Sequence, residues 1–146
     1  MTALAAAYAR PCMDEHNAVY RDYLVEAGET IYQGALVMVD TDGYLTTGVD
    51  TANCKVVGVA DETVTNSGAD GAAVCRVKSG CSFKFAASSI AVGDFDAPLM
   101  YVVDDNTVDE TSPANSVKAG LHVPPYISTT EGWVYIPPFG VFTYGL

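Results

Sequence analysis

The stretch Ala73-Val-Cys-Arg-Val-Lys-Ser-Gly-Cys-Ser-Phe-Lys-Phe85 is the clearest structural signal in this chain of 146 residues. From Cys75 onward, its odd positions are mostly apolar and its even positions are basic or polar. Successive side chains of a strand point to opposite faces, so this alternation predicts half-buried β-structure with Phe83 and Phe85 in the core. Gly80 indicates a bulge or a sharp bend that preserves this facing on both sides.

Short segments of the same kind recur along the middle of the chain. They are rich in β-branched and aromatic residues and end in turn sequences such as Asp40-Thr-Asp-Gly43 and Asn66-Ser-Gly-Ala-Asp-Gly71. Further strands are expected at residues 30–39, 44–47, 56–64, 99–103, 117–123 and 132–136. The first two of these should form a hairpin. This rhythm of strands and turns is typical of a sandwich or a barrel.

The sequence therefore predicts an all-β fold with three zones. Residues 27–136 are expected to form a compact small β-barrel or sandwich domain. Residues 1–26 are expected to form an extended N-terminal arm, ordered mainly by a neighbouring protein, and residues 137–146 a short aromatic C-terminal tail. Within the arm, a weak pattern allows a short helix over residues 13–24.

The charge and the cysteines limit the classes of partner. The net charge is −11 with only seven Lys and Arg residues, so no nucleic acid is expected to bind. No apolar run approaches the ~20 residues of a membrane helix, so no membrane partner is expected. The four cysteines lack the spacing of a zinc site and are predicted to be buried free thiols in a reducing cytoplasm, with two disulfides as the alternative. They are Cys12, Cys54, Cys75 and Cys81.

The chain offers little of the chemistry that an enzyme needs. The two histidines, His16 and His122, lie in no nucleophile or phosphate-loop motif. Asp40 and Asp42 resemble the start of a calcium loop, but the Gly and Glu of an EF-hand do not follow, so a hairpin turn is favoured. The four carboxylates in residues 104–110 fit a solvated loop, with calcium or a basic partner as alternatives. We expect no catalytic site, no cofactor and no metal site.

Aromatic residues outside the strand pattern indicate contacts with other proteins. Tyrosine and phenylalanine are enriched where protein surfaces meet, because they bury a large area. In the alternative interpretation, both termini fold back onto their own barrel. The candidate contact residues, which include two arginines of this acidic chain, are Tyr8, Arg10, Tyr20, Arg21, Tyr23, Phe139, Phe142 and Tyr144.

Several stretches spaced over about residues 28–136 match a known family in order and spacing. They are Glu29–Val37, Val57–Val64 with Asn66–Gly71, Val77–Gly80 leading to Phe83–Ala86, Tyr101–Val108, Ala119-Gly120, and Gly132–Ile136. With them the chain resembles the capsid decoration proteins of tailed bacteriophages, long catalogued as a domain of unknown function. The first 26 and the last ten residues lie outside the matching region.

The resemblance implies a β-barrel-like domain that sits on the outer face of a phage head and bridges neighbouring capsomers as a cement protein. It implies the major capsid protein as partner, assembly in the host cytoplasm, and no active site or cofactor. Because several weak contacts bind more strongly together, a homotrimer on the shell is expected. The alternatives are a virion-surface host- or glycan-binding module, a tail-tube or head-completion protein, and a small hydrolase assembled from distant residues.

Overall fold

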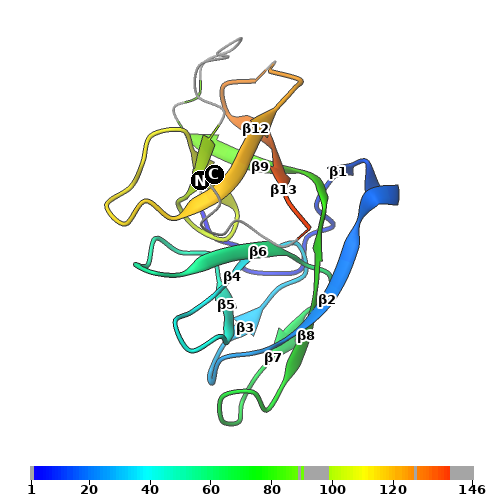
Figure 1. The fold of residues 1–146 in the computed structure, drawn as a ribbon, viewed down its shortest axis with the longest axis vertical. Coiled ribbons are helices and arrows are strands. Elements are labelled where there is room, and N and C mark those ends of the chain that lie inside the picture. Colours follow the sequence, from blue (N-terminus) through cyan, green and yellow to red (C-terminus); the bar gives the residue numbers. More distant parts are fainter. Residues whose placement is uncertain (1, 89, 91–98, 127, 139–146) are drawn as a thin grey trace.

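The computed structural model describes residues 2–88, 90, 99–126 and 128–138, and these residues form an all-β structure (Figure 1). The helical segment within them is the single 3₁₀ turn η1 (Glu15–Asn17). The strands are β1 (Cys12–Met13), β2 (Val19–Leu24), β3 (Thr30–Ile31), β4 (Leu36–Val39), β5 (Leu45–Thr47), β6 (Lys55–Ala60), β7 (Val64–Thr65), β8 (Val74–Ser79), β9 (Cys81–Ser88), β10 (Leu99–Val102), β11 (Thr107–Asp109), β12 (Lys118–Val123) and β13 (Glu131–Ile136).

The first lobe, residues 19–79, is built on a five-stranded sheet in the order β2-β8-β6-β4-β5. The sheet curls until its ends meet, because Val25 forms a parallel bridge with Leu45 and Glu26 N donates to Leu45 O at 3.0 Å. Strands β3 and β7 pair with each other as a separate two-stranded sheet. The core of this lobe contains Val25, Ile31, Ala35, Val37, Leu45, Val57, Ala60, Cys75 and Val77.

The second lobe, residues 81–136, is a closed five-stranded barrel. Its strands pair in the order β9-β11-β10-β12-β13, and β13 pairs back with β9 along Glu131–Ile136. The β9–β11 contact is parallel, as is the bridge that joins the ends of the first-lobe sheet. Strand β1 lies outside this ring and pairs with β9. The predicted small β-barrel is confirmed.

The two lobes repeat one strand topology. Strands β2, β8, β6, β4 and β5 correspond in pairing order to β9, β13, β12, β10 and β11. The residue pairing matches as well. In the first lobe, Val37 of β4 pairs with Gly58 of β6, and in the second, Met100 of β10 pairs with Gly120 of β12. In both lobes the pairing shifts by an irregularity directly after this position. Gly58 and Gly120 also share nearly the same φ, +154° and +155°. Identical residues occur at only some equivalent positions, such as Gly58 and Gly120, and the repeat is recognised from the strand pairing.

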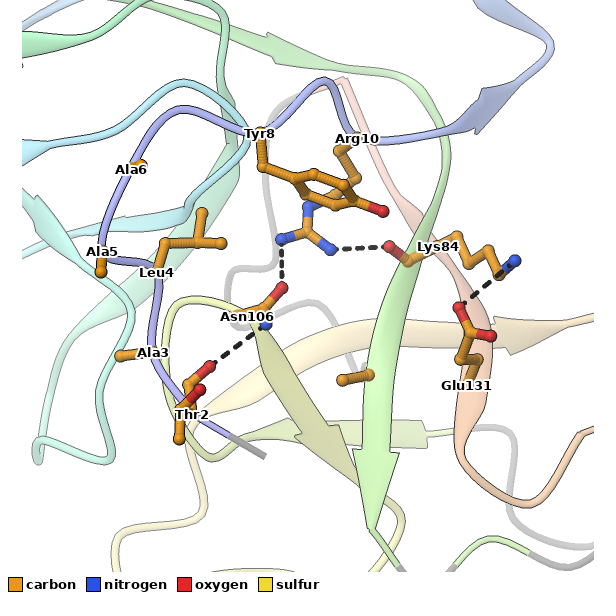
Figure 2. Close-up of a pocket in the computed structure, with 11 residues that line it drawn as sticks. Thr2, Ala3, Leu4, Ala5, Ala6, Tyr8, Arg10, Lys84, Asn106 and Glu131 are labelled. Carbon is orange, nitrogen blue, oxygen red and sulfur yellow. Dashed lines mark hydrogen bonds and ion pairs between the residues drawn. The ribbon is translucent and has the colours of Figure 1, made fainter.

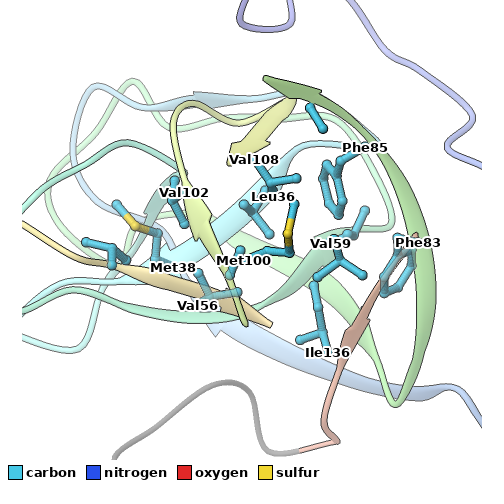
Figure 3. Packing of buried hydrophobic residues seen from close by; sticks show 14 of the residues in the cluster. Leu36, Met38, Val56, Val59, Phe83, Phe85, Met100, Val102, Val108 and Ile136 are labelled. Carbon is cyan, nitrogen blue, oxygen red and sulfur yellow. The ribbon is translucent and has the colours of Figure 1, made fainter. Parts of the chain in front are cut away.

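Strands β4 and β6 form a wall between the lobes, and β6 runs between the two halves of the molecule in Figure 1. Val37 and Val57 belong to the first-lobe core, whereas Leu36 and Val56 belong to the second-lobe core. Burial on both faces explains the continuous apolar runs in these strands. Figure 3 shows the second-lobe core, in which Leu36, Met38, Val56 and Val59 lie with Phe83, Phe85, Met100, Val102, Val108 and Ile136.

The alternating stretch Ala73–Phe85 is divided between the lobes. It forms β8 and β9, and Gly80, with a φ of +79°, turns the chain between them. The predicted facing is confirmed, because Phe83 and Phe85 are 1% and 0% exposed. Lys78 differs from its polar-face neighbours, since its side chain bonds to Glu15 and is only 11% exposed.

Strand boundaries account for the remaining differences from the sequence prediction. The hairpin of β4 and β5 is confirmed, but the strand expected over residues 30–39 is two strands, β3 and β4. The short helix allowed over residues 13–24 is wrong, because Val19–Leu24 pairs with β8 along its whole length as β2. Pairing with a neighbouring strand outweighs a weak local helical pattern. Strands β1 and β2 therefore lie within residues 1–26, the zone expected to be an arm. Residues 2–11 precede the first strand.

Alanine at Gly58 or Gly120 is expected to lower the free energy of unfolding by about 2–3 kcal/mol in urea denaturation. A Cβ at Gly58 would lie 2.4 Å from Lys78 O, and one at Gly120 would lie 2.4 Å from Tyr135 O. Gly28→Ala is the control, because Gly28 also has a positive φ (+78°) but a Cβ there would meet nothing within 4 Å. An equal loss of stability in all three variants would contradict the steric explanation.

Candidate functional site

Arg10 attaches the N-terminal segment, residues 2–10, to both lobes (Figure 2). Its Nε donates to Gly34 O in the first lobe at 2.6 Å. Its two terminal nitrogens donate to Lys84 O and Asn106 Oδ1 in the second lobe, both at 2.7 Å. A planar guanidinium can serve several acceptors in fixed directions, which an ammonium cannot. Arg10 therefore joins the segment and the two lobes.

Aromatic rings and burial determine the environment of the Arg10 guanidinium. Its Cζ lies 4.1 Å from the centroid of the Phe85 ring and 5.0 Å from that of the Tyr8 ring. Burial lowers the pKa of Arg10 to about 10, although Tyr8, Asp105 and Asp104 act in the opposite direction. The side chain is cationic at neutral pH, and the faces of the two rings stabilise its charge.

Backbone hydrogen bonds hold the rest of the N-terminal segment. Tyr8 N donates to Gln33 O, and Leu4 N donates to Asp105 Oδ1, both at 2.8 Å. Asp105 is buried, and this burial raises the pKa of its carboxyl group. Residues 2–10 thus make these contacts within their own chain. The sequence-based hypothesis instead expects a neighbouring protein to order this segment.

A cavity of about 460 Å³ lies beneath the N-terminal segment (Figure 2). Arg10 and Asn106 line one part of it, and the ion pair of Lys84 with Glu131, at 3.2 Å, lines another. These polar groups are already bonded within the chain. The cavity therefore belongs to the attachment of the segment, which Arg10 holds in place, while the Lys84–Glu131 ion pair joins β9 to β13.

A second surface, the β2–β8 face, carries exposed apolar side chains. Leu24 and Val74 lie directly opposite each other on the two strands and are each 50% exposed. Tyr20 on the same face is 48% exposed and adjoins a hollow of about 440 Å³. Asp61 and Arg76 line the same hollow and form an ion pair at 3.0 Å. We define the β2–β8 face as Tyr20, Asp22, Leu24, Val74, Arg76 and Lys78.

Strand β2 is an end strand within the described part of the chain. From Val19 to Leu24 it pairs with β8 alone. Its counterpart in the second lobe, β9, pairs with β13 and also with β1, where Cys12 lies opposite Phe83. Among the described residues, no strand pairs with β2 in the way that β1 pairs with β9. End strands of this kind can bind another polypeptide.

Five of the sequence-predicted contact residues lie in the described N-terminal region. Tyr8 is 41% exposed, whereas Arg10 is half-buried and bonded within the chain. Tyr20 and Arg21 are exposed on β2. Tyr23 is half-buried against the first-lobe core, and burial raises its pKa. The structure therefore brings Tyr20 to the β2–β8 face and assigns Arg10 and Tyr23 to contacts inside the molecule.

The remaining three candidates, Phe139, Phe142 and Tyr144, lie outside the described residues. Leu24 and Val74, the central apolar pair of the β2–β8 face, were not predicted as contact residues. The sequence contained a signal for Val74, because Val74 is an apolar residue at one of the even positions, which are otherwise basic or polar in the alternating stretch. Leu24 could not be found in this way, because its strand was not predicted.

The described residues contain no cluster of three or more His, Cys, Asp or Glu side chains that could hold a metal ion. Asp40 Oδ1 instead accepts hydrogen bonds from Asp42 N and Tyr44 N, so this carboxylate stabilises the β4–β5 turn. His122 is buried, and its ring packs edge-on to Tyr126 at a centroid distance of 4.8 Å. In the part of the chain that is described, no helix has the length and hydrophobicity to cross a membrane.

Comparisons with known proteins identify no relative of this chain. No family model matches its sequence, no curated protein matches it, and no solved structure matches its fold.

Proposed function

We propose that this chain is a capsid decoration protein that binds the outer face of a tailed-phage head and reinforces the contacts between capsomers. Two features support the proposal: the resemblance over about residues 28–136, and an all-β structure with a closed barrel. The observation that carries it is the β2–β8 face, where apolar side chains are exposed at an end strand. A cement protein acts through such a contact surface.

The β2–β8 face has the composition of a binding surface. Leu24 and Val74 form an apolar centre, and the opposed pair of Asp22 and Arg76 lies beside them. Protein interfaces combine an apolar centre with a polar rim, and the centre supplies most of the binding energy. The hollow beside Tyr20 offers a place for a side chain of the partner. The overall charge of −11 favours a basic surface on that partner.

Several copies acting together would strengthen attachment to the shell. A chain of 146 residues offers each neighbour only a modest contact area. Joining three weak contacts raises overall avidity by ~10²–10⁴ without new contact chemistry. The proposal therefore includes a homotrimer, formed on the shell at a local three-fold axis, with the major capsid protein as its partner.

Leu24→Glu is expected to weaken binding to shells by about tenfold or more, because binding would desolvate a carboxylate at the apolar centre of the face. Cosedimentation with shells that have been stripped of the protein measures this affinity. Val49→Glu is the matched control, since Val49 is 46% exposed and lies outside the β2–β8 face. Equal affinities for the two variants would contradict the assigned surface.

The same particles test the reinforcing role. Stripped shells should rupture at a lower temperature than intact shells, and adding the protein back should restore them, because contacts across capsomer boundaries oppose expansion. Stripped particles that match intact ones under heat and osmotic shock would refute the cement function. Binding of the purified protein to host-surface glycans would then support a virion-surface binding module.

A further inference from the structure

Cys12 and Cys81 lie on the same face of the second-lobe sheet. Strand β1 pairs with β9 so that Cys12 is directly opposite Phe83. Opposite residues of an antiparallel pair project to the same face, and so do residues two apart on one strand. Cys81 is two residues from Phe83 and belongs to the same core, against which Cys12 packs. The two thiols are therefore diagonal neighbours.

The two thiols differ in their surroundings. Cys12 is half-buried, whereas Cys81 is 0% exposed. Burial, reinforced by the neighbouring Cys12 side chain, raises the pKa of Cys81 to about 12. Cys81 is thus a protonated thiol at neutral pH, and Cys12 is the less buried residue of the pair.

A cation, Lys78, lies beside the Cys12 sulfur. Lys78 Nζ donates to Cys12 Sγ at 3.3 Å and also forms an ion pair with Glu15. Burial alone would lower the pKa of Lys78, but its bonds to Glu15 and Cys12 raise the pKa above its ordinary value. A pocket of about 210 Å³ is lined in part by Glu15, Lys78 and Phe83, and Cys12 adjoins it through its contacts with Lys78 and Phe83 rather than lining it. An adjacent ammonium stabilises the negative charge on a nucleophilic sulfur.

We propose that Cys12 and Cys81 are an oxidisable dithiol, which a peroxide or a small disulfide converts into a bond that links the N-terminal segment to β9. With hydrogen peroxide, the Cys12 sulfur attacks one peroxide oxygen and becomes a sulfenic acid, while water leaves. The Cys81 sulfur then attacks the Cys12 sulfur, and the hydroxyl group departs with the Cys81 proton as a second water. Two thiols are oxidised, and one peroxide is reduced to two waters. With a small disulfide, the Cys12 sulfur displaces one small thiol to form a mixed disulfide, and the Cys81 sulfur then displaces the second, so that one disulfide is reduced to two thiols.

Closing the bond requires a small movement of β1. Diagonal neighbours in an antiparallel pair have Cα atoms roughly 7–8 Å apart, and a disulfide needs about 4.4–6.8 Å. Strand β1 has two paired residues, and the shift would act against the hydrogen bond from Lys84 N to Pro11 O at 3.0 Å. The chemistry is independent of the proposed function. Only its timing, when a particle leaves the reducing host cytoplasm, rests on that function.

The experiment treats the reduced full-length protein with hydrogen peroxide and, separately, with oxidised glutathione. The intact mass should fall by two hydrogen atoms, and peptide mapping should join Cys12 to Cys81. The buried Cys54 and Cys75 should still be alkylated after denaturation. The melting temperature should rise by about 10 °C and return after reduction, because the bond closes a long loop in the unfolded chain.

Single substitutions separate the roles of the three side chains. Cys12→Ser and Cys81→Ser should each abolish both the bond and the thermal shift. Lys78→Met should slow bond formation about three- to tenfold, and Lys78→Arg should restore most of the rate. A bond between another pair of cysteines, or over-oxidation of Cys12 with Cys81 left reduced, would overturn the proposal. Shell binding is no part of these readouts, so failure of the decoration function would not change them.

Discussion

Replacing Phe83 with alanine is expected to lower the free energy of unfolding by about 3–5 kcal/mol. The Phe83 side chain is 1% exposed and lies in the second-lobe core, opposite Val134 of β13. The ring is enclosed by a closed barrel in which β9 has strand partners on both sides, so the surrounding chain cannot collapse to fill the cavity. Urea denaturation followed by the fluorescence of Trp133 measures the loss.

Surface truncations provide the controls for Phe83→Ala. Tyr20→Ala removes an aromatic ring that is 48% exposed, so we expect a loss of only about 0.5 kcal/mol. Arg76→Ala should cost about as little, because the Arg76 side chain is 52% exposed and its ion pair with Asp61 is at the surface. If either surface variant were less stable than Phe83→Ala, the assigned facing of these strands would be wrong.

Replacing Arg10 with alanine is expected to lower the free energy of unfolding by about 3 kcal/mol. The change removes the guanidinium hydrogen bonds to Gly34 O, Lys84 O and Asn106 Oδ1 and the packing on Phe85. It also leaves part-buried acceptors without their donor, which carries its own desolvation cost. Urea denaturation measures stability, and hydrogen exchange should become faster in residues 2–10.

Arg10→Lys separates the shape of the side chain from its charge. Lysine preserves the positive charge, but a single ammonium cannot reach acceptors in both lobes at once. The lysine variant should therefore lose most of the stability that the alanine variant loses. A lysine variant with wild-type stability and unchanged exchange in residues 2–10 would show that charge alone holds the segment.

The sequence was sufficient wherever a local pattern determines the structure. The alternation across β8 and β9 predicted their facing, because the side-chain period of a strand is two regardless of its partner. Asp40 and Gly43 predicted the β4–β5 turn, because an aspartate that bonds to nearby backbone amides favours a turn locally. The pattern failed for β2, whose side chains are mostly exposed and whose extended backbone depends on pairing with β8.

The candidate site was predicted in part. Tyr20 was proposed as a contact residue because it is an aromatic outside the predicted strand pattern, and the structure places it exposed on the β2–β8 face. Arg10 was assigned to the same kind of surface, yet its acceptors are provided by Gly34, Lys84 and Asn106, up to 96 residues away. No local pattern connects such positions, and the fold alone brings them together.

The sequence by itself therefore determined the all-β class, the main turns, and which side chains of the central strands face the core. These features depend on neighbours within a few residues. Only the tertiary structure decided the repeat of the two lobes, the shared wall of β4 and β6, and the exposed β2–β8 face. It also brought Lys78 to Cys12, across 66 residues of chain. These features depend on strand pairing between distant segments, which is selected by the burial of the whole core rather than by any short stretch.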